Sequence, residues 1–209
     1  MIRILQLPLG PLQTNCYVLA DLDTKQAAVI DPSWDGRAIA EQARQQGWTI
    51  SHILLTHTHF DHVGGLAELK ALSGAPIYVH PDATAMLSNA PRAAMIWGIT
   101  IDPPPPPDVL LQGDETIQVG TLLLDVLYTP GHAPGHVCFH LAAEKVLFDG
   151  DVLFQDSIGR TDLPGGDYDL LLTSIRDKLL PLPDETAVLS GHGPATTIGD
   201  ERRTNPFLT

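Results

Sequence analysis

The sequence predicts an α/β protein made of two similar layers, each consisting of a β-sheet and covering helices. Residues 1–90 run from strand-like apolar segments to helix-like segments and back to a strand, and residues 113–209 repeat that order. Between the halves stand five consecutive prolines, Pro103–Pro107, which fit neither a helix nor a central strand. With 209 residues and a hydrophobic fraction of 44%, we expect one domain of generous size spanning residues 1–209.

In the first half, apolar residues at helical spacing predict helices, and short apolar runs bounded by turn residues predict strands. The helices Arg37–Gln46 and Leu66–Leu72 stop at Gly47 and Gly74, and Pro81 opens a third short helix that runs to Ser88. The predicted strands are Ile2–Leu7, Asn15–Ala20, Ala27–Ile30, His52–Leu55 and Ile77–His80.

Residues 89–112 break this pattern. We interpret them as a stiff surface connector, because the proline run favours an extended chain. The apolar residues Met95, Ile96 and Trp97 precede the prolines and also suit a wall of an active site. The two roles are compatible.

The second half begins again with strands linked by tight turns. Asp167–Leu180 is a helix with its leucines and Ile175 on one side, and Pro181 and Pro183 end it. A polar tail is expected after Leu189. The predicted strands are Glu115–Val119, Leu122–Tyr128, His136–Leu141, Lys145–Phe148 and Thr186–Leu189.

The charge and the cysteine content limit the classes of partner and compartment. The formal net charge of -13 argues against nucleic acid or an anionic membrane as the main partner. Only two cysteines occur, Cys16 and Cys138, which suits a reducing compartment. Pro8 and Pro11 interrupt the mildly apolar N-terminus, so we expect no signal peptide, no membrane span and a cytoplasmic protein.

The densest group of ligand-type side chains follows the predicted strand at Ile53–Leu55. It comprises His57, His59, Asp61 and His62, and the first two leave the same face of an extended backbone. Crowded imidazoles and carboxylates repel when charged and need partners when buried. A divalent cation resolves both problems, because it binds neutral imidazole and ionised carboxylate. This segment therefore predicts a metal site.

Three further predicted strands are each followed by a glycine and then a ligand-type residue. Strand ends on one rim of a layered sheet are common positions for functional sites, and glycine lets backbones approach closely. We therefore expect one rim to gather five histidines and two aspartates. The three later pairs are Gly131-His132, Gly150-Asp151 and Gly191-His192.

The segment His57–His62 resembles the HxHxDH motif of the metallo-β-lactamase superfamily, and the later pairs follow the order of that family's other motifs. The resemblance spans nearly the whole chain. It implies an αββα sandwich of two mixed β-sheets flanked by helices, in agreement with the two-half pattern. Three segments resemble the glyoxalase II-like (hydroxyacylglutathione hydrolase-like) branch, particularly its short bacterial members: Thr129–His136, Ile158–Gly166 and Asn205–Leu208.

Carried over residue by residue, the resemblance implies two divalent metal ions. Imidazoles and hard carboxylates suit zinc, iron or manganese, and we expect zinc. Asp61 is expected to act mainly as a ligand and also to help orient water. The first site would use His57, His59 and His132, the second Asp61, His62 and His192, and Asp151 would bridge them.

The resemblance implies hydrolysis of thioesters, with S-lactoylglutathione as the family's typical substrate. Water shared by two cations has its pKa lowered from about 15.7 toward ~7, and the bridging hydroxide would attack the thioester carbonyl. A thiol leaving group of pKa about 8.5 departs without a strong general acid. The expected partner is thus a small acyl-thiol, rather than a nucleic acid or a membrane.

Two alternatives stay open. Persulfide dioxygenases resemble the same motifs but use a single iron, bound by the residues that match His57, His132 and Asp151. A non-catalytic metal-binding protein fits less well, because a structural zinc needs four closed ligands rather than seven around an open rim. A β-lactamase is disfavoured, because many such enzymes have a cysteine at the position of Asp151.

Substrate recognition departs from that of full-length glyoxalase II. Those enzymes carry an additional C-terminal helical domain for glutathione, and we expect none here because the chain ends soon after His192. Arg160 stands in a loop where the longer enzymes contact glutathione. It would bind a substrate carboxylate or form a structural salt bridge with Asp162 or Asp156, and both interpretations stay open.

The remaining candidates receive structural interpretations. His136 is expected to support or pack against the site rather than to bind metal. Asp31 and Asp149 would either orient a ligand imidazole or simply form turns. The histidines expected to be hydrogen-bonded structural residues are His52, His80 and His140.

Overall fold

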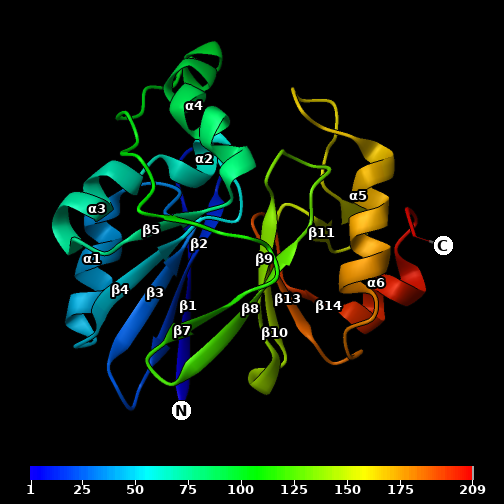
Figure 1. Ribbon diagram of the computed structural model, residues 1–209, viewed down its shortest axis with the longest axis horizontal. Helices are drawn as coiled ribbons and strands as arrows, with labels where there is room; N and C mark the ends of the chain where they lie inside the picture. Colours follow the sequence, from blue (N-terminus) through cyan, green and yellow to red (C-terminus); the bar gives the residue numbers. More distant parts are fainter. Residues whose placement is uncertain (209) are drawn as a thin grey trace.

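The computed structural model describes residues 1–208 and contains two six-stranded mixed sheets packed against each other (Figure 1). In the first sheet, β1 to β3 pair antiparallel and β3 to β6 pair parallel, so the strand order follows the sequence. Its strands are β1 (Ile2–Leu9), β2 (Thr14–Asp21), β3 (Gln26–Ile30), β4 (Thr49–Leu54), β5 (Ile77–Val79) and β6 (Val109–Leu110).

The second sheet has the order β14-β13-β10-β9-β8-β7. Among its paired strands in the described chain, only β10 and β13 run parallel. The long connection that joins them contains a helix, α5 (Tyr168–Ser174). A small hairpin, β11 (Leu153–Phe154) with β12 (Ser157–Ile158), follows β10. The strands of the sheet are β7 (Thr116–Val119), β8 (Leu122–Tyr128), β9 (Val137–Leu141), β10 (Val146–Gly150), β13 (Ala187–Ser190) and β14 (Thr196–Thr197).

Helices cover the outer face of each sheet, on the left and on the right of Figure 1. The first sheet carries α1 (Gly36–Gln45), α2 (Phe60–Val63), α3 (Leu66–Ser73), η1 (Pro81–Ala83) and α4 (Thr84–Ile96). The second carries α5 (Tyr168–Ser174) with its π-helical continuation η3 (Ile175–Leu179), and α6 (Ile198–Thr204), whereas η2 (Ala142–Glu144) forms the turn between β9 and β10. Within residues 1–208, no helix is both long enough and apolar enough to cross a membrane.

The alternation of side chains along β2 separates two hydrophobic cores. Tyr17 and Leu19 point into the core between the sheets, whereas Cys16 and Val18 join the core beneath α1 and α3. A third core lies between the second sheet and α5, where Cys138 meets Leu171, Ile175 and neighbouring apolar residues. Helix layer, sheet, sheet and helix layer follow one another, which is the predicted αββα sandwich.

Helix α4 is longer than the predicted helix Pro81–Ser88, and it takes up the first part of the predicted connector. Pro91 lies inside it, although proline cannot donate the backbone hydrogen bond of a helix interior. Leu87, Ala90 and Ala94 of this helix are buried in the first core. Burial of that face outweighs the local penalty, so the prediction of a helix end at Ser88 was wrong.

The predicted polar tail after Leu189 also forms structure, namely β14 and α6. Thr197 caps α6 by accepting a hydrogen bond from the Asp200 backbone N–H at 3.1 Å. Ile198 is fully buried in the third core. Glu201 is buried and accepts a hydrogen bond from the Asp156 backbone N–H at 2.9 Å. The prediction that Thr186–Leu189 is the last strand was wrong, and α6 was not predicted, because partners such as Asp156 lie far away in the sequence.

Candidate metal centre

The structure brings all seven predicted metal ligands to one rim of the sandwich. Four of them follow β4, in the loop after Leu54 and in the short helix α2. The other three follow β8, β10 and β13, one each. The seven side chains form two triads that share one carboxylate: His57, His59 and His132; Asp61, His62 and His192; and Asp151 between them.

The first triad consists of three imidazoles. His59 Nδ1 lies 3.1 Å from His57 Nε2 and 3.0 Å from His132 Nε2. A tetrahedral metal with bonds of about 2.0–2.1 Å to nitrogen places its ligand atoms ~3.3 Å apart. The three nitrogens therefore lie at separations that suit one small cation.

The second triad combines one carboxylate with two imidazoles. His192 Nε2 lies 3.1 Å from Asp61 Oδ2, and His62 Nε2 lies 3.8 Å from the same oxygen. His62 is fully buried, whereas about a third of the His192 side chain is exposed. This mixed set of oxygen and nitrogen donors suits zinc, iron or manganese.

Asp151 faces both triads. Its Oδ1 lies 3.4 Å from His62 Nε2, and its Oδ2 lies 3.6 Å from both His132 Nε2 and His192 Nε2. Two of these atoms, His62 Nε2 and Asp151 Oδ1, are buried and make no hydrogen bond within the described chain. Buried polar atoms without partners are rare, and a divalent cation would satisfy both. The residues present therefore fit a two-metal centre.

Hydrogen bonds around His57 direct one of its ring nitrogens into the centre. The Thr56 hydroxyl donates to Asp31 Oδ2 at 2.6 Å, because a carboxylate only accepts. His57 Nδ1 lies 3.1 Å from the same hydroxyl oxygen and must therefore donate to it. Its Nε2 then keeps a free lone pair that faces the first triad.

The same arrangement recurs at two other ligands. His62 Nδ1 donates to Asp31 Oδ2 at 2.9 Å, and His132 Nδ1 donates to the Arg160 carbonyl oxygen at 2.7 Å. Each Nε2 points into the centre, where it can bind a metal once it carries no proton. Asp31 thus orients a ligand imidazole, whereas Asp149 accepts from the Leu153 backbone N–H at 2.8 Å and orients none.

The electrostatics of the first triad favour neutral imidazoles. Burial lowers the pKa of His57 well below its ordinary value, and the neighbouring histidines lower it further. Burial, followed by His132, lowers the pKa of His59 to about 4. Burial also lowers the pKa of His132. Neutral imidazole is the form that binds a metal.

The second triad shows the opposite shifts. Burial alone would lower the pKa of His62, but the carboxylates of Asp151 and Asp61 outweigh it and raise that pKa well above its ordinary value. Burial would likewise lower the pKa of His192, but Asp61 and Asp151 outweigh it and raise that pKa. Burial would raise the pKa of Asp61, but His62 and His192 hold it at about 2.

Three residues at the start of β2 hold this rim together and were not predicted. The Thr14 hydroxyl donates to Asp61 Oδ2 at 2.9 Å. Asn15 Nδ2 donates to the carbonyl oxygens of Ser190 and Gly193 at 2.9 and 3.0 Å, and the Tyr17 hydroxyl donates to Ser190 at 2.7 Å. These bonds fix the loop that carries His192. The sequence feature that could have indicated these residues is the polar pair Thr14-Asn15 at the start of an otherwise apolar strand.

Gly191 permits the close packing of the centre. A Cβ atom at this position would meet Asp151 Oδ1 and would lie 2.6 Å from His62 Cε1. No side chain fits there without moving a ligand. The expectation that glycine next to a ligand allows close approach is confirmed at this position.

Arg160 forms a two-pronged ion pair with Asp162, with Nε–Oδ1 and Nη2–Oδ2 distances of 2.7 and 2.8 Å. Both side chains are largely exposed. The backbone carbonyl of Arg160 holds His132, so the loop supports the centre through its main chain. Binding of a substrate carboxylate by this side chain stays a prediction.

Four histidines lie outside the two triads, and three of them, His52, His80 and His140, were expected to be structural. His52 contacts Ser51, at 2.9 Å between ring nitrogen and hydroxyl oxygen, and His80 stacks on Tyr128 with ring centroids 4.5 Å apart. Neither these two nor His140 belongs to a group of ligand atoms within 4.8 Å of one another in residues 1–208. Their structural interpretation is consistent with this arrangement.

The end of α4 exposes the apolar residues Met95, Ile96 and Trp97. The Trp97 ring lies 6.3 Å, centroid to centroid, from Phe60 at the start of α2. Because α2 carries Asp61 and His62, this apolar end adjoins the helix that supplies the second triad. The segment thus ends α4 and lies near α2, and its role as a wall of the active site stays a prediction.

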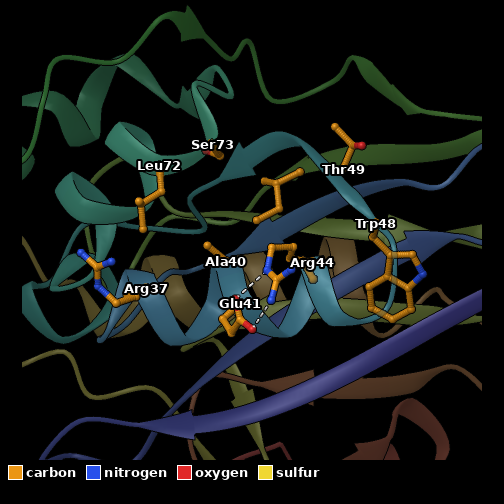
Figure 2. Close-up of a pocket in the computed structure, with 10 residues that line it drawn as sticks. Arg37, Ala40, Glu41, Arg44, Trp48, Thr49, Leu72 and Ser73 are labelled. Atoms are coloured by element: carbon orange, nitrogen blue, oxygen red, sulfur yellow. Dashed lines mark hydrogen bonds and ion pairs between the residues drawn. The ribbon is translucent and has the colours of Figure 1, made fainter.

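A hollow of about 410 Å³ lies on the outer face of the first helical layer (Figure 2). Arg37, Glu41, Arg44, Trp48 and Leu72 are among its lining residues. Glu41 and Arg44 pair with each other along it, with contacts of 2.7 and 2.8 Å. None of the predicted metal ligands lines this hollow, so it is separate from the rim described above.

Comparison with known proteins identifies the family. The profile of the metallo-beta-lactamase superfamily matches residues 9–192, and the chain belongs to that superfamily. The chain is 41% identical over 204 residues to "Hydroxyacylglutathione hydrolase GloC" of Haemophilus influenzae, which covers 97% of this chain and 96% of that protein. The family, the fold and the clustered ligands together define a metal-dependent hydrolase.

Two solved structures share the whole fold. One is the crystal structure of the BLEG-1 B3 metallo-beta-lactamase, with 46% identity, a TM-score of 0.93 and coverage of 99% of this chain and 100% of that one. The other is TTHA1623 in a di-iron-bound form, with 42% identity, a TM-score of 0.90 and coverage of 98% and 100%.

Proposed function

We propose that the protein hydrolyses thioesters of the hydroxyacylglutathione type at a two-metal centre. The observation that carries the proposal is the position of Asp151 between the triads. Its Oδ1 lies 3.4 Å from His62 of the second triad, and its Oδ2 lies 3.6 Å from His132 of the first and from His192 of the second. A shared carboxylate of this kind offsets the charge of two close cations. The 41% identity to a hydroxyacylglutathione hydrolase supports the substrate class.

The side chains of the centre have separate tasks in this proposal. Two bound cations would lower the pKa of water toward ~7 and polarise the substrate carbonyl. Thr14 holds Asp61 by its hydroxyl, so that Asp61 keeps a fixed orientation in the second triad. The first cation would be held by His57, His59 and His132, the second by Asp61, His62 and His192, and both by Asp151.

A thioester is a suitable substrate because its leaving group needs no strong general acid from this rim. His57, His62 and His132 each commit the Nδ1 proton to an oxygen behind the centre and turn Nε2 toward it. With a cation bound at each Nε2, none of the three would have a proton to give to a leaving group. Hydrolysis of a thioester converts it and one water into a carboxylate, a thiol and one proton. The thiol has a pKa of about 8.5, so it can leave as a thiolate and take up a proton from water afterwards.

The test combines metal analysis with a substrate panel. Protein purified without added metal is analysed for metal atoms per chain and assayed with S-lactoylglutathione, a simple acyl thioester and a chromogenic β-lactam. We expect close to two atoms of zinc, iron or manganese, and turnover fastest on the glutathione thioester. Exhaustive chelation should stop turnover, and metal should restore it.

Different results would point to different enzymes. Faster cleavage of the β-lactam than of either thioester would replace the proposal with the activity for which the 46% identical metallo-beta-lactamase is named. One iron per chain, with oxygen consumed in the presence of glutathione persulfide, would replace it with the dioxygenase. Metal bound without turnover of any substrate in the panel would leave a metal-binding protein.

A further inference from the structure

A continuous chain of hydrogen bonds lies behind the metal centre and uses none of the predicted ligand side chains. The Asp151 backbone N–H donates to His136 Nε2 at 3.2 Å. His136 Nδ1 lies 3.0 Å from Thr129 Oγ1, which lies 3.2 Å from Cys138 Sγ. Cys138 Sγ lies 3.5 Å from the Asp149 carbonyl oxygen. The chain thus starts and ends on the same turn, at the end of β10.

The two ends of this chain determine the position of every proton in it. A backbone N–H only donates, so His136 Nε2 accepts and its Nδ1 carries the proton. That proton is donated to the Thr129 hydroxyl oxygen, whose own proton is donated to Cys138 Sγ. The thiol in turn donates to the Asp149 carbonyl, which only accepts. Each donor meets one acceptor.

The surroundings of His136 explain why it stays neutral and fixed. The residue is fully buried, and burial lowers the pKa of the ring well below its ordinary value. The ring stacks on the His57 ring at 5.0 Å between centroids and an angle of 24°. Gly150 has a φ of +55°, and a Cβ there would lie 2.7 Å from His136 Nε2. The ring therefore occupies the space beside the turn that carries Asp151.

We propose that His136 is a positioning residue, which holds the Asp151 backbone and thereby sets both carboxylate oxygens between the two triads. Thr129 and Cys138 hold the imidazole in the one tautomer that can accept the Asp151 N–H. This inference rests on the proposed ligand role of Asp151. A buried N–H that loses its acceptor is costly, so the turn moves when the imidazole nitrogen is removed.

Three substitutions separate the functions of the ring. His136→Gln keeps an acceptor near the position of Nε2, His136→Asn keeps only a donor near Nδ1, and His136→Phe keeps only the stacking on His57. We expect His136→Gln to bind two metal ions per chain with near wild-type affinity. The Asn and Phe variants should bind them about 10–100-fold more weakly, the range for groups that orient metal ligands. Affinity is measured by competition with a chromogenic chelator.

The residues behind the ring give a graded series. Thr129→Val removes the acceptor of the Nδ1 proton, so that both tautomers become accessible and affinity falls, but less than in His136→Asn. Cys138→Ala removes only the last bond of the chain and should have the smallest effect. The tautomer is read directly from nitrogen-15 NMR of the metal-free wild-type ring. We expect a protonated Nδ1 and a bare Nε2.

The outcomes distinguish this inference from the proposed function. Equal metal affinity in the Gln, Asn and Phe variants, or equal loss in all three with retained circular dichroism, would overturn the inference. If a variant fails to fold, the NMR measurement decides, and a protonated Nε2 in the wild-type protein overturns it. A wild-type chain with the expected tautomer that binds no metal would refute the proposed function but leave the geometry of the ring intact.

Discussion

The two triads of the candidate centre lie on one rim but differ in charge. The first is all imidazole, and burial lowers each of its pKa values. The second contains Asp61, and its two histidines have raised pKa values because carboxylates surround them. In the absence of metal, the first triad favours neutral imidazoles, whereas the second favours protonated ones on His62 and His192.

This difference predicts two unlike metal sites. A metal entering the second triad has to displace protons, so its affinity should depend more strongly on pH than that of the first. Asp151 joins the sites, because each of its oxygens faces the second triad and one also faces the first. Substitutions and changes of pH can test the comparison, beginning with the largest effect.

Asp151→Ala should abolish the difference between the sites by emptying both. The substitution removes the only carboxylate that lies within 3.6 Å of both triads among the described residues. We expect activity at background and no bound metal, measured by assay and by elemental analysis.

Two controls accompany this variant. His192→Ala should lose the metal of the second triad and keep that of the first, because the ligands that His192 contacts are Asp61, His62 and the shared Asp151. Asp156→Asn changes an exposed carboxylate whose left-handed backbone also suits asparagine, and it should keep two metals. Two metals retained by Asp151→Ala would refute the bridging role.

Acid should destabilise the metal-free protein through the first triad. His59 has a folded pKa of about 4 against 6.5 when unfolded, so the unfolded chain binds more protons between these values. Stability is therefore lost as pH falls from 6.5 to 4, and His59 alone accounts for about 3 kcal/mol of the loss. His57 and His132 act in the same direction.

His62 opposes this trend. Its raised folded pKa contributes stability that is complete below pH 6.5 and disappears as pH rises through the folded value. Urea unfolding in the presence of a chelator, from pH 8 to pH 4, measures the sum. Stability that is constant or rises toward pH 4 would contradict the electrostatic description of the first triad.

Asp31→Asn should weaken the second site more than the first. An asparagine amide in place of Oδ2 faces the His62 Nδ1 proton, which then favours the tautomer with a proton on Nε2. The backbone of Asp31 is left-handed, a conformation that asparagine tolerates. We expect a loss of about 10–100-fold in metal affinity at the second site, measured in a two-site metal titration. An equal loss at both sites would place the main effect at Thr56 and His57 instead.

Arg160→Ala should have the smallest effect. If the side chain leaves Asp162 to bind a substrate carboxylate, KM rises and kcat is unchanged, because ground state and transition state lose the same contact. The melting temperature should hardly change, because both partners of the ion pair are largely exposed. An unchanged KM with a lower melting temperature would identify the pair as structural.

Local patterns in the sequence were sufficient to predict the layered fold. The apolar runs, such as β2 with all eight residues buried, and the repeated order of strands and helices reflect which side chains avoid water, and this is visible in neighbouring residues. The helix through Pro91 was missed because a local penalty was weighed without the buried face of α4. Helix α6 was missed because Glu201 finds one of its partners, Asp156, 45 residues away.

In the candidate site, too, features set by neighbouring residues were predicted, whereas those set by distant partners were not. The seven ligand-type residues follow strand ends, so their gathering on one rim could be expected from order and spacing alone. Thr14, Asn15 and Tyr17 could not be assigned, because their acceptors lie on other loops. The role of His136 depends on the direction of a backbone N–H, which only the folded chain defines.

The bonds from Asn15 to Ser190 have a consequence for the time at which the centre forms. These residues are 175 positions apart, so the loop bearing His192 can be fixed only when almost the whole chain has left the ribosome. The ligand-type residues at positions 57–62 leave the ribosome much earlier, before the other residues of the centre have been synthesised. We therefore expect metal binding to follow the end of translation. A shortage of metal would then affect completed chains rather than chains still being synthesised.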